Sequence, residues 1–594
     1  MDDQNKNLIL ATALSFIVIL VWFVLFPPPE PVQPVDTPAA VAAADGSTTL
    51  GVDAEVPSQA VEAVIVPQTA EDVIANAPRV SIDSPSLTGS LSLTGGRIDD
   101  LSLKNYRETL DDDAELVRLL SPIGTDDPYY ALHGWVAAVG ATAEQVPGAS
   151  TEWQIESGET LSPGSDVTLV WDNGAGLTFR KAFAVDDDFL FTVTQSVENT
   201  TGAEIALRPY GLVARHGEPD QIGFFIQHEG VVRMSDGSME EIDYGDMPYL
   251  TTEDGRIEVA ENGWIGFSDQ YWMTALIPSP GRDFRSTARF GNDIYQIETV
   301  YPMVTVAAGA SLDAQTQFFA GAQEWEVIRT YQNDLGIDRF LDSIDWGWFF
   351  FLTKPIFAVL HWLNGLIGNM GWAIIGLTLI IKALLLPLAY KSYVSMAKMR
   401  ELQPEMEKLK EAAGDDREKL QKGMMELYKT NKVNPASGCL PILLQIPIFF
   451  SLYKVIFVTI ELRHAPWLGW IDDLSAPDSS SLFNLFGILP WAGPPEGSIL
   501  ALIFIGILPI FLGVSMWLQQ KLNPPVTDPT QRMIFAWMPW VFMFMLGSFA
   551  SGLVLYWIAN NTITFIQQYT IMRSQGVKPD IFGNILGRTK SDSK

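Results

Sequence analysis

The sequence predicts a polytopic α-helical membrane protein, with six spans of which five form a helical core, that also carries an all-β sandwich domain. Two observations predict this fold class. After residue 371, apolar stretches recur that approach the roughly 20 residues needed to cross a bilayer. Residues 78–335 instead show short runs of alternating apolar and polar side chains, separated by Gly, Asn and Asp, which is typical of half-buried strands.

The charge of the chain is concentrated in one region. The 594 residues carry a net charge of -32. Residues 28–350 hold 52 acidic and 16 basic side chains, whereas the rest of the chain holds 18 acidic and 22 basic ones. The acidic surface therefore belongs to the β domain, where it favours solubility and disfavours nucleic acid as a direct partner. A single cysteine, Cys439, excludes a disulfide framework within one chain.

Residues 1–26 are predicted to form an N-terminal transmembrane anchor. The run at 8–26 is almost entirely apolar and is not followed by a small-residue cleavage site, so an uncleaved signal-anchor is favoured over a removed signal peptide. Residues 27–77 are rich in Pro, Ala, Val and acidic side chains without helical or strand periodicity. We expect this segment to be a flexible tether.

Within the β domain, residues 167–183 are predicted to form a β-hairpin. Apolar alternation at 167–171 and 177–183 flanks the turn sequence Asp-Asn-Gly-Ala-Gly, and a further strand is expected at 189–197. The domain shows no phosphate-binding loop and no nucleophile elbow. We expect a scaffold without a metal or another cofactor, because its three histidines lack metal-ligand spacing: His133, His216 and His228.

Five apolar stretches and the N-terminal anchor make the six predicted spans. The five stretches are 372–390, 439–460, 499–518, 534–549 and 552–572, separated by loops at 391–438, 461–498 and 519–533 and followed by a tail at 573–594. Ten Lys or Arg at 391–432 place the first of these loops in the cytoplasm by the positive-inside rule. Both termini are then cytoplasmic and the β domain lies outside.

Residues 336–371 are predicted to hold an amphipathic helix at the outer membrane surface. The segment 346–367 is apolar enough to cross, but it is rich in aromatic side chains and interrupted by Lys354-Pro355. A crossing here would also place the basic loop outside the cell. Within that basic loop, apolar residues recur at three-four spacing on both sides of residues 414–416, which predicts a hairpin of two antiparallel helices.

Lys382 is the most informative residue of the membrane part. It lies in the apolar run 373–390, where an ammonium group costs at least ~2.5 kcal/mol. Thr378 shares its helix face, and the predicted spans offer no deep carboxylate to neutralise the charge. We therefore expect a hydrated cavity or groove, with water, lipid phosphate or a transient acidic segment as the partner of Lys382. Polar residues on other spans are available to line it: Gln445, Tyr556, Asn560, Thr564 and Gln567.

Several motifs closely resemble the YidC family of membrane protein insertases. The resemblance covers residues 345–573 and extends more weakly into the β domain, as in the Gram-negative form with a large periplasmic domain. The motifs are MAKMR at 396–400, LQP at 402–404, KVNP at 432–435, GC at 438–439, QIPIF at 445–449, DP at 528–529, SGLVLY at 551–556, QQ at 567–568, GW at 263–264 and QY at 270–271.

This resemblance implies an insertase and chaperone of the bacterial inner (plasma) membrane that is not an enzyme and needs no cofactor. It implies nascent membrane proteins as substrates, with the SecYEG translocon and membrane lipids as partners. The basic hairpin is then either a docking surface for a ribosome or targeting factor, or simply a self-contained pair of helices. The stretch at 479–497 is longer than is usual in the family, and the resemblance gives it no role.

The resemblance also places a substrate groove. Its positive charge falls on Lys382, where the family commonly has arginine; lysine keeps the charge but lacks the planar bidentate guanidinium. The other groove positions are Thr378, Gln445, Tyr556, Trp557 and Asn560. Apolar faces that would guide an emerging helix into lipid surround Phe449, Phe450 and Phe542.

Two other classes of protein stay open on the residues alone. An ion or solute transporter using Lys382 would normally show acidic residues in its spans and inverted repeats, and neither is visible. A membrane-tethered periplasmic carbohydrate-binding protein would need paired carboxylates and stacking aromatics in a cleft. Composition permits such a cleft, but no spacing in the sequence singles it out.

Overall fold

The computed structural model describes residues 68–577, except 112, 220–226, 415, 432, 434–439, 492, 495–497, 499, 501–502 and 524–528. The predicted anchor and most of the predicted tether lie outside the described residues. The end of the tether forms a short helix, α2 (Ala70–Ala75), which Thr69 caps by accepting a hydrogen bond from the backbone N–H of Asp72. Such a helix is too short to show apolar periodicity in the sequence.

The β domain consists of two sheets that share one core. The first has 11 strands in the order β14-β17-β18-β11-β5-β3-β2-β1-β7, with β19 beside β11 and β4 beside β3. The second has 9 strands in the order β13-β12-β15-β16-β20-β10-β9-β8-β6. The predicted all-β domain is therefore confirmed.

The strands of the first sheet are β1 (Arg79–Asp83), β2 (Leu87–Ser92), β3 (Arg97–Arg107), β4 (Leu116–Leu120), β5 (Tyr129–Ala137), β7 (Thr160–Leu161), β11 (Ile205–His216), β14 (Arg256–Val259), β17 (Phe284–Gly291), β18 (Ile294–Val300) and β19 (Val304–Val306). Those of the second sheet are β6 (Gln154–Ser157), β8 (Val167–Asp172), β9 (Leu177–Val185), β10 (Leu190–Asn199), β12 (Gly230–Ser235), β13 (Ser238–Asp243), β15 (Gly263–Ser268), β16 (Trp272–Pro278) and β20 (Ser311–Ala322).

The predicted hairpin is formed by β8 and β9. The two strands pair antiparallel from Val167 opposite Phe183 to Asp172 opposite Thr178. In the turn, Asn173 Oδ1 accepts the backbone N–H groups of Ala175 and Leu177, at 2.8 and 3.0 Å. Every second residue of β9 is buried, as the alternation in the sequence predicts.

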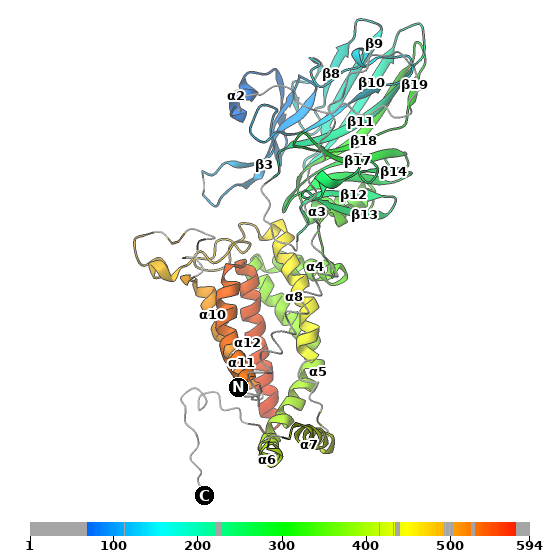
Figure 1. Cartoon of the computed structure of the whole chain (residues 1–594). Coiled ribbons are helices and arrows are strands. Elements are labelled where there is room, and N and C mark those ends of the chain that lie inside the picture. The colour runs from blue at the N-terminus through cyan, green and yellow to red at the C-terminus, as the bar shows by residue number, and fades with distance from the viewer. Residues whose placement is uncertain are drawn as a thin grey trace, which may run out of the picture. The chain divides into compact units, whose positions relative to one another are not determined.

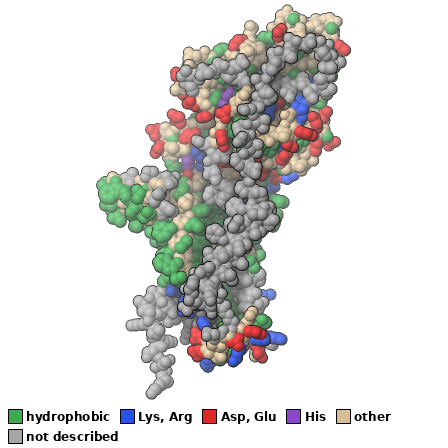
Figure 2. Space-filling model, viewed as in Figure 1, with side chains coloured by type: hydrophobic (Ala, Val, Ile, Leu, Met, Phe, Trp, Pro, Cys, Tyr) green, Lys and Arg blue, Asp and Glu red, His purple; other side chains and the backbone are tan. Residues whose placement is uncertain are grey.

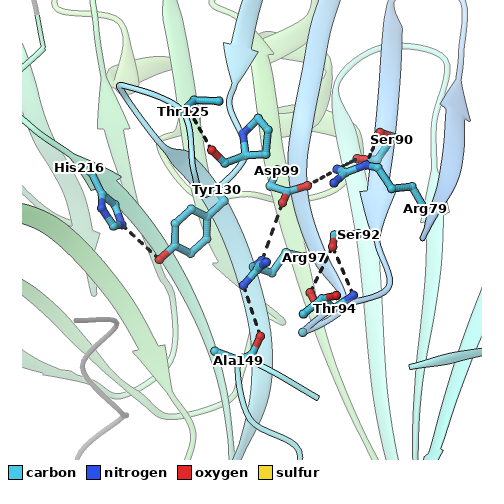
Figure 3. A network of polar contacts seen from close by, with 12 residues as sticks. Arg79, Ser90, Ser92, Thr94, Arg97, Asp99, Thr125, Tyr130, Ala149 and His216 are labelled. Carbon is cyan, nitrogen blue, oxygen red and sulfur yellow. Dashed lines mark hydrogen bonds and ion pairs between the residues drawn. The ribbon is translucent and has the colours of Figure 1, made fainter. Parts of the chain in front are cut away.

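Polar side chains are buried in the core of the β domain, among them those around Asp99 and around Lys181. Around Asp99, the guanidinium of Arg79 forms a buried ion pair and that of Arg97 lies 3.8 Å away (Figure 3). Burial raises the pKa of Asp99, and the two arginines oppose that shift. Elsewhere in the core, Lys181 Nζ donates to the carbonyl of Gly95 at 2.8 Å. Burial and the nearby Lys181 charge lower the pKa of His133 to about 3.

The described residues that follow the β domain are mostly helical (Figure 1). A short helix α3 (Trp325–Asp334) follows the last strand, and the membrane part begins with α4 (Phe350–Ile367) and α5 (Met370–Glu401). The remaining helices are α6 (Gln403–Ala413), α7 (Arg417–Thr430), α8 (Leu440–Val458), α10 (Ile507–Leu522), α11 (Pro529–Met545) and α12 (Ser551–Ser574). Helix α12 packs against α5 and α10, whereas α8 packs against α4.

Two helices within the described ranges are long and apolar enough to cross a membrane, α4 and α5, and the segment Leu443–Val458 of α8 is a shorter apolar helix. The predicted total of six spans is not confirmed. The interfacial position of α4 stays a prediction, because α4 passes the same test as α5. Contrary to the sequence interpretation, Lys354-Pro355 does not interrupt this helix; a proline near the helix start removes only one backbone hydrogen bond.

The basic loop contains the two helices α6 and α7, which pack against each other. Gly414 ends α6 with a positive φ of 55°, and Asp416 caps α7 by accepting the backbone N–H of Lys419 at 3.0 Å. A Cβ atom on Gly423 would lie 2.6 Å from Leu409 Cδ2. The small residue therefore lets the two helices approach closely.

Figure 2 shows that acidic side chains gather over the β strands, while apolar ones cover the helices of the membrane part.

Candidate substrate groove among the membrane helices

The ammonium group of Lys382 lies where three helices meet. Lys382 is half-buried on α5, and its Nζ donates to Gln445 Oε1 on α8 at 3.2 Å. The amide nitrogen of Gln445 donates in turn to the hydroxyl of Tyr556 on α12. A continuous chain of polar groups thus connects α5, α8 and α12 inside an otherwise apolar set of helices.

A cavity of about 30 Å³ adjoins this chain. That volume is enough for about one or two water molecules. Gln567 Nε2 reaches across the cavity region to the backbone carbonyl of Lys382, at 3.4 Å. The cavity is lined by Lys382, Leu385, Leu388, Ala389, Tyr393, Leu444, Gln445 and Gln567.

Lys382 has capacity for further hydrogen bonds. A lysine ammonium carries three donors, and Gln445 accepts one of them. Within the described residues, no carboxylate lies within ion-pair distance of Lys382. No fixed acidic side chain in the described part of the chain therefore neutralises this cation. The hydrated groove around it stays a prediction.

Thr378 does not contribute to this cavity. Its side chain is 1% exposed, and Oγ1 donates to the carbonyl of Ile374, one turn earlier on α5, at 2.7 Å. The hydroxyl is thus used within its own helix. Sequence spacing places Thr378 on the face of Lys382, but the structure directs its hydrogen bond to the backbone.

A second polar cluster lies between α10 and α12. Asn560 Nδ2 donates to Asn561 Oδ1 at 3.5 Å, and Asn561 Nδ2 donates to Ser515 Oγ on α10 at 3.1 Å. Asn560 Oδ1 and Thr564 Oγ1 are buried and find no acceptor or donor among the described groups. The sequence analysis missed Asn561 and Ser515, although three consecutive polar residues at 560–562 in a predicted span are a visible signal.

Aromatic rings extend from the polar chain along α8 and α12. The ring of Phe449 stacks on Trp557 with centroids 5.1 Å apart, and it meets Phe450 edge-on at 5.4 Å. Phe450 is exposed, and its contact with lipid stays a prediction. Phe542 is half-buried on α11, and no ring contact in the described part of the chain joins it to Phe449 or Phe450.

Besides Lys382 on α5, the membrane helices contain a second buried lysine on α8, which the sequence analysis did not identify. Lys454 is buried, with a side chain 9% exposed, and it forms an ion pair with Asp345 just before α4. Asp345 Oδ2 also accepts the backbone N–H of His228 at 3.0 Å. Lys454 is thus a neutralised structural cation, unlike Lys382. No sequence spacing reveals this pair, since 109 residues separate its members.

The fold and this site define an integral membrane protein whose apolar helices surround a cation without a fixed counter-ion, with a large all-β domain attached. Two family models match the chain: "YidC periplasmic domain" at residues 79–359 and "60Kd inner membrane protein" at residues 362–578. The chain therefore belongs to the YidC family of membrane protein insertases, which is not a family of enzymes. The resemblance drawn from the motifs is confirmed.

Full-length relatives support this assignment. The "Membrane protein insertase YidC" of Roseobacter denitrificans is 64% identical over 607 residues, covering 100% of both chains. That of Dinoroseobacter shibae is 65% identical over 600 residues, covering 99% of both chains. A crystal structure described as an active YidC insertase with its first transmembrane domain resolved is 18% identical, covers 83% of this chain and 94% of its own, and has a TM-score of 0.35.

Proposed function

We propose that this protein inserts newly made proteins into the inner membrane and helps them fold, using the groove around Lys382 to receive a polar segment. The names of its full-length relatives support the insertase function. The transporter and carbohydrate-binding alternatives are not favoured, because relatives that match the whole chain are insertases.

The observation that carries this proposal is the incomplete pairing of Lys382. Its Nζ is hydrogen-bonded to a neutral amide and adjoins a small cavity lined by both polar and apolar side chains. A carboxylate or polar backbone from an incoming chain can replace the Gln445 amide or water as partner. Two unit charges 4 Å apart attract by about 4 kcal/mol at an effective dielectric constant of 20. The attraction to Lys382 therefore offsets part of the hydration free energy that an acidic segment loses when it leaves water.

Insertion then follows from a shorter hydrocarbon path. The groove hydrates the polar segment part of the way across, while the apolar transmembrane stretch leaves water at a gain of about 25 cal/mol per Å² of apolar surface. Phe449, Phe450 and Phe542 are the side chains we assign to the lipid-facing path of the emerging helix. The remaining groove residues that we propose are Gln445, Tyr556, Trp557 and Asn560. Thr378, the further groove position expected from the family resemblance, lies on the same helix as Lys382 but keeps its hydroxyl bonded within α5.

The proposed topology has six spans with a five-helix core, both termini in the cytoplasm and α4 at the periplasmic surface of the membrane. The ten basic residues at 391–432 support a cytoplasmic position for α6 and α7. In this arrangement the hairpin is available to a ribosome or targeting factor, and the lateral surface is available to lipids and a SecYEG translocon.

The experiment that tests the groove is reconstitution of the protein alone into proteoliposomes with a substrate that needs no translocon. Lys382→Ala and Lys382→Glu should abolish insertion, whereas Lys382→Arg, the matched control, should retain it because the charge is kept. Unchanged insertion by the Glu variant, with reconstituted amounts equal to wild type, would contradict the proposal.

A further inference from the structure

The loop between α8 and α10 exposes a continuous apolar surface. Residues 479–495 contain no charged side chain. Ile488 is 81% exposed, and five other large apolar residues of the loop are also exposed: Leu482, Phe483, Leu485, Phe486 and Trp491. In Figure 2, which has the view of Figure 1, this region beside α10 is a protrusion covered by hydrophobic side chains. A surface of this kind in water marks an interaction site.

The loop satisfies its polar groups internally. The backbone N–H of Phe486 donates to the carbonyl of Ser481 at 2.8 Å, and that of Leu489 donates to the carbonyl of Asn484 at 3.0 Å. Trp491 Nε1 donates to the carbonyl of Phe483 at 3.2 Å. Backbone groups that enter hydrocarbon must be paired in this way, because no water is present to replace a missing partner.

The turn conformation at the tip is unusual for apolar residues. Leu485 and Phe486 have φ of 49° and 59°, the left-handed region that side chains other than glycine seldom adopt. Their side chains are exposed. The strain is tolerated because hydrogen bonds on both sides fix the turn.

The base of the loop is fixed to the start of α10. Asp478 Oδ2 accepts the backbone N–H of Leu508 at 2.7 Å, and Ser480 Oγ accepts that of Ile507 at 2.9 Å. Ser481 Oγ donates to the carbonyl of Phe504 at 2.7 Å. The exposed apolar surface continues through Ile503, just before α10, to Phe511 on that helix.

The loop leaves the helices at the end that adjoins the β domain. The segment preceding it contacts the start of α12, where the N–H of Gly552 donates to the carbonyl of Leu474 at 2.8 Å. Within the same segment, Arg463 Nη2 donates to the carbonyl of Arg107 on β3 at 2.6 Å. This is the end that carries the family's periplasmic domain. Trp470 and Trp491 are both exposed there, as is typical of side chains at a membrane interface.

We propose that residues 482–491 form a wedge that inserts into the outer leaflet of the inner membrane beside α10. Its partner is the phospholipid bilayer, at the level of the upper acyl chains. Three features favour lipid over a protein: the absence of charge, the internal pairing of the backbone, and continuity with the exposed apolar side of a membrane helix. The wedge goes beyond the proposed function, since it does not involve Lys382.

The depth of the wedge can be measured on the full chain. Cys439→Ser removes the native thiol, and Ile488→Cys accepts an environment-sensitive fluorophore; the high exposure of Ile488 means that labelling does not disturb packing. The matched control is Asp472→Cys, an exposed position in the same connection. Both are reconstituted into phosphatidylethanolamine and phosphatidylglycerol vesicles that contain nitroxide lipids.

The label at 488 should emit at shorter wavelength than the label at 472 and be quenched several-fold more strongly by nitroxides near the head group. Equal emission and equal quenching at the two positions would overturn the proposal. A blue shift that disappears when the protein is diluted in lipid would also overturn it, because the occupant would then be a second copy of the chain. Neither readout depends on insertion activity, so failure of the groove hypothesis and failure of the wedge are distinguishable.

Discussion

The ammonium group of Lys382 donates to the side-chain oxygen of Gln445 on the neighbouring helix at 3.2 Å. A second lysine of the membrane part, Lys454 on α8, is buried and is neutralised by Asp345 instead. The two cations differ in what they leave available. Lys454 has a fixed anionic partner, whereas the hydrogen-bond partner of Lys382 is a neutral amide. In the proposed function, the uncompensated charge of Lys382 meets a carboxylate of the incoming chain.

Gln445→Glu should inhibit insertion by supplying Lys382 with a permanent counter-ion. A carboxylate at this position would form an ion pair with Nζ and compete with acidic groups of the substrate. We expect roughly a tenfold lower initial rate, which corresponds to about 1.4 kcal/mol. The measurement is insertion of an acidic-tailed single-span substrate into proteoliposomes. The isosteric Gln445→Met variant separates loss of the amide from gain of the charge. A Gln445→Glu variant that inserts the substrate as fast as wild type would contradict this prediction.

Lys454→Ala should destabilise the protein strongly. The substitution leaves the Asp345 carboxylate, whose side chain is 16% exposed, without its cation. Breaking a buried ion pair from one side costs about 3–5 kcal/mol. Thermal unfolding in detergent should therefore show a lower Tm, and the double variant Lys454→Met with Asp345→Asn should recover part of it. Lys422→Ala, at an exposed ion pair on α7, serves as the control with no measurable change.

His133 should make the stability of the β domain depend on pH. Burial and Lys181 lower the pKa of His133 to about 3, below its ordinary value near 6.5, so the folded protein keeps the imidazole neutral. The unfolded chain then binds more protons between these values. The contribution of neutral His133 to the stability of the folded domain is present above pH 6.5. It is lost as the pH falls toward 3, by about 1.4 kcal/mol per pH unit.

The measurement is denaturant unfolding of the full chain followed by tryptophan fluorescence at pH 7 and pH 5. Other groups also titrate in this interval, so the expected result is a difference: wild type should lose about 2 kcal/mol more than His133→Leu on acidification. Parallel losses in the two proteins would show that His133 is protonated in the folded state.

Charge reversal on α7 should separate ribosome docking from insertion. Lys419, Lys422 and Lys429 are exposed on this helix. Replacing all three with Glu should weaken co-sedimentation with ribosomes that display a nascent membrane segment, and wild-type binding should fall as salt rises. Insertion of a released substrate by the purified protein should remain unchanged. Glu405→Lys together with Glu411→Lys on α6 is the control, and undiminished co-sedimentation of the triple variant would argue for a hairpin that only packs against itself.

The sequence alone determined the division into an all-β region and a helical membrane region. Strand and helix periodicity are local properties, since they depend on which neighbouring side chains are apolar. The β8–β9 hairpin was predictable for this reason, because the turn residues and the flanking alternation are contiguous. Lys382 also stood out locally, as a charge in an apolar run.

The tertiary structure decided which partners these residues meet. Lys382 and Gln445 lie 63 residues apart and Gln445 and Tyr556 lie 111 apart, so their contacts depend on how α5, α8 and α12 pack. The same is true of Lys454 and Asp345. Thr378 shares the spacing of a groove residue but bonds to its own helix. Helical spacing fixes the face on which a side chain lies, whereas packing between distant segments determines whether that face meets a cavity, a backbone carbonyl or another charge.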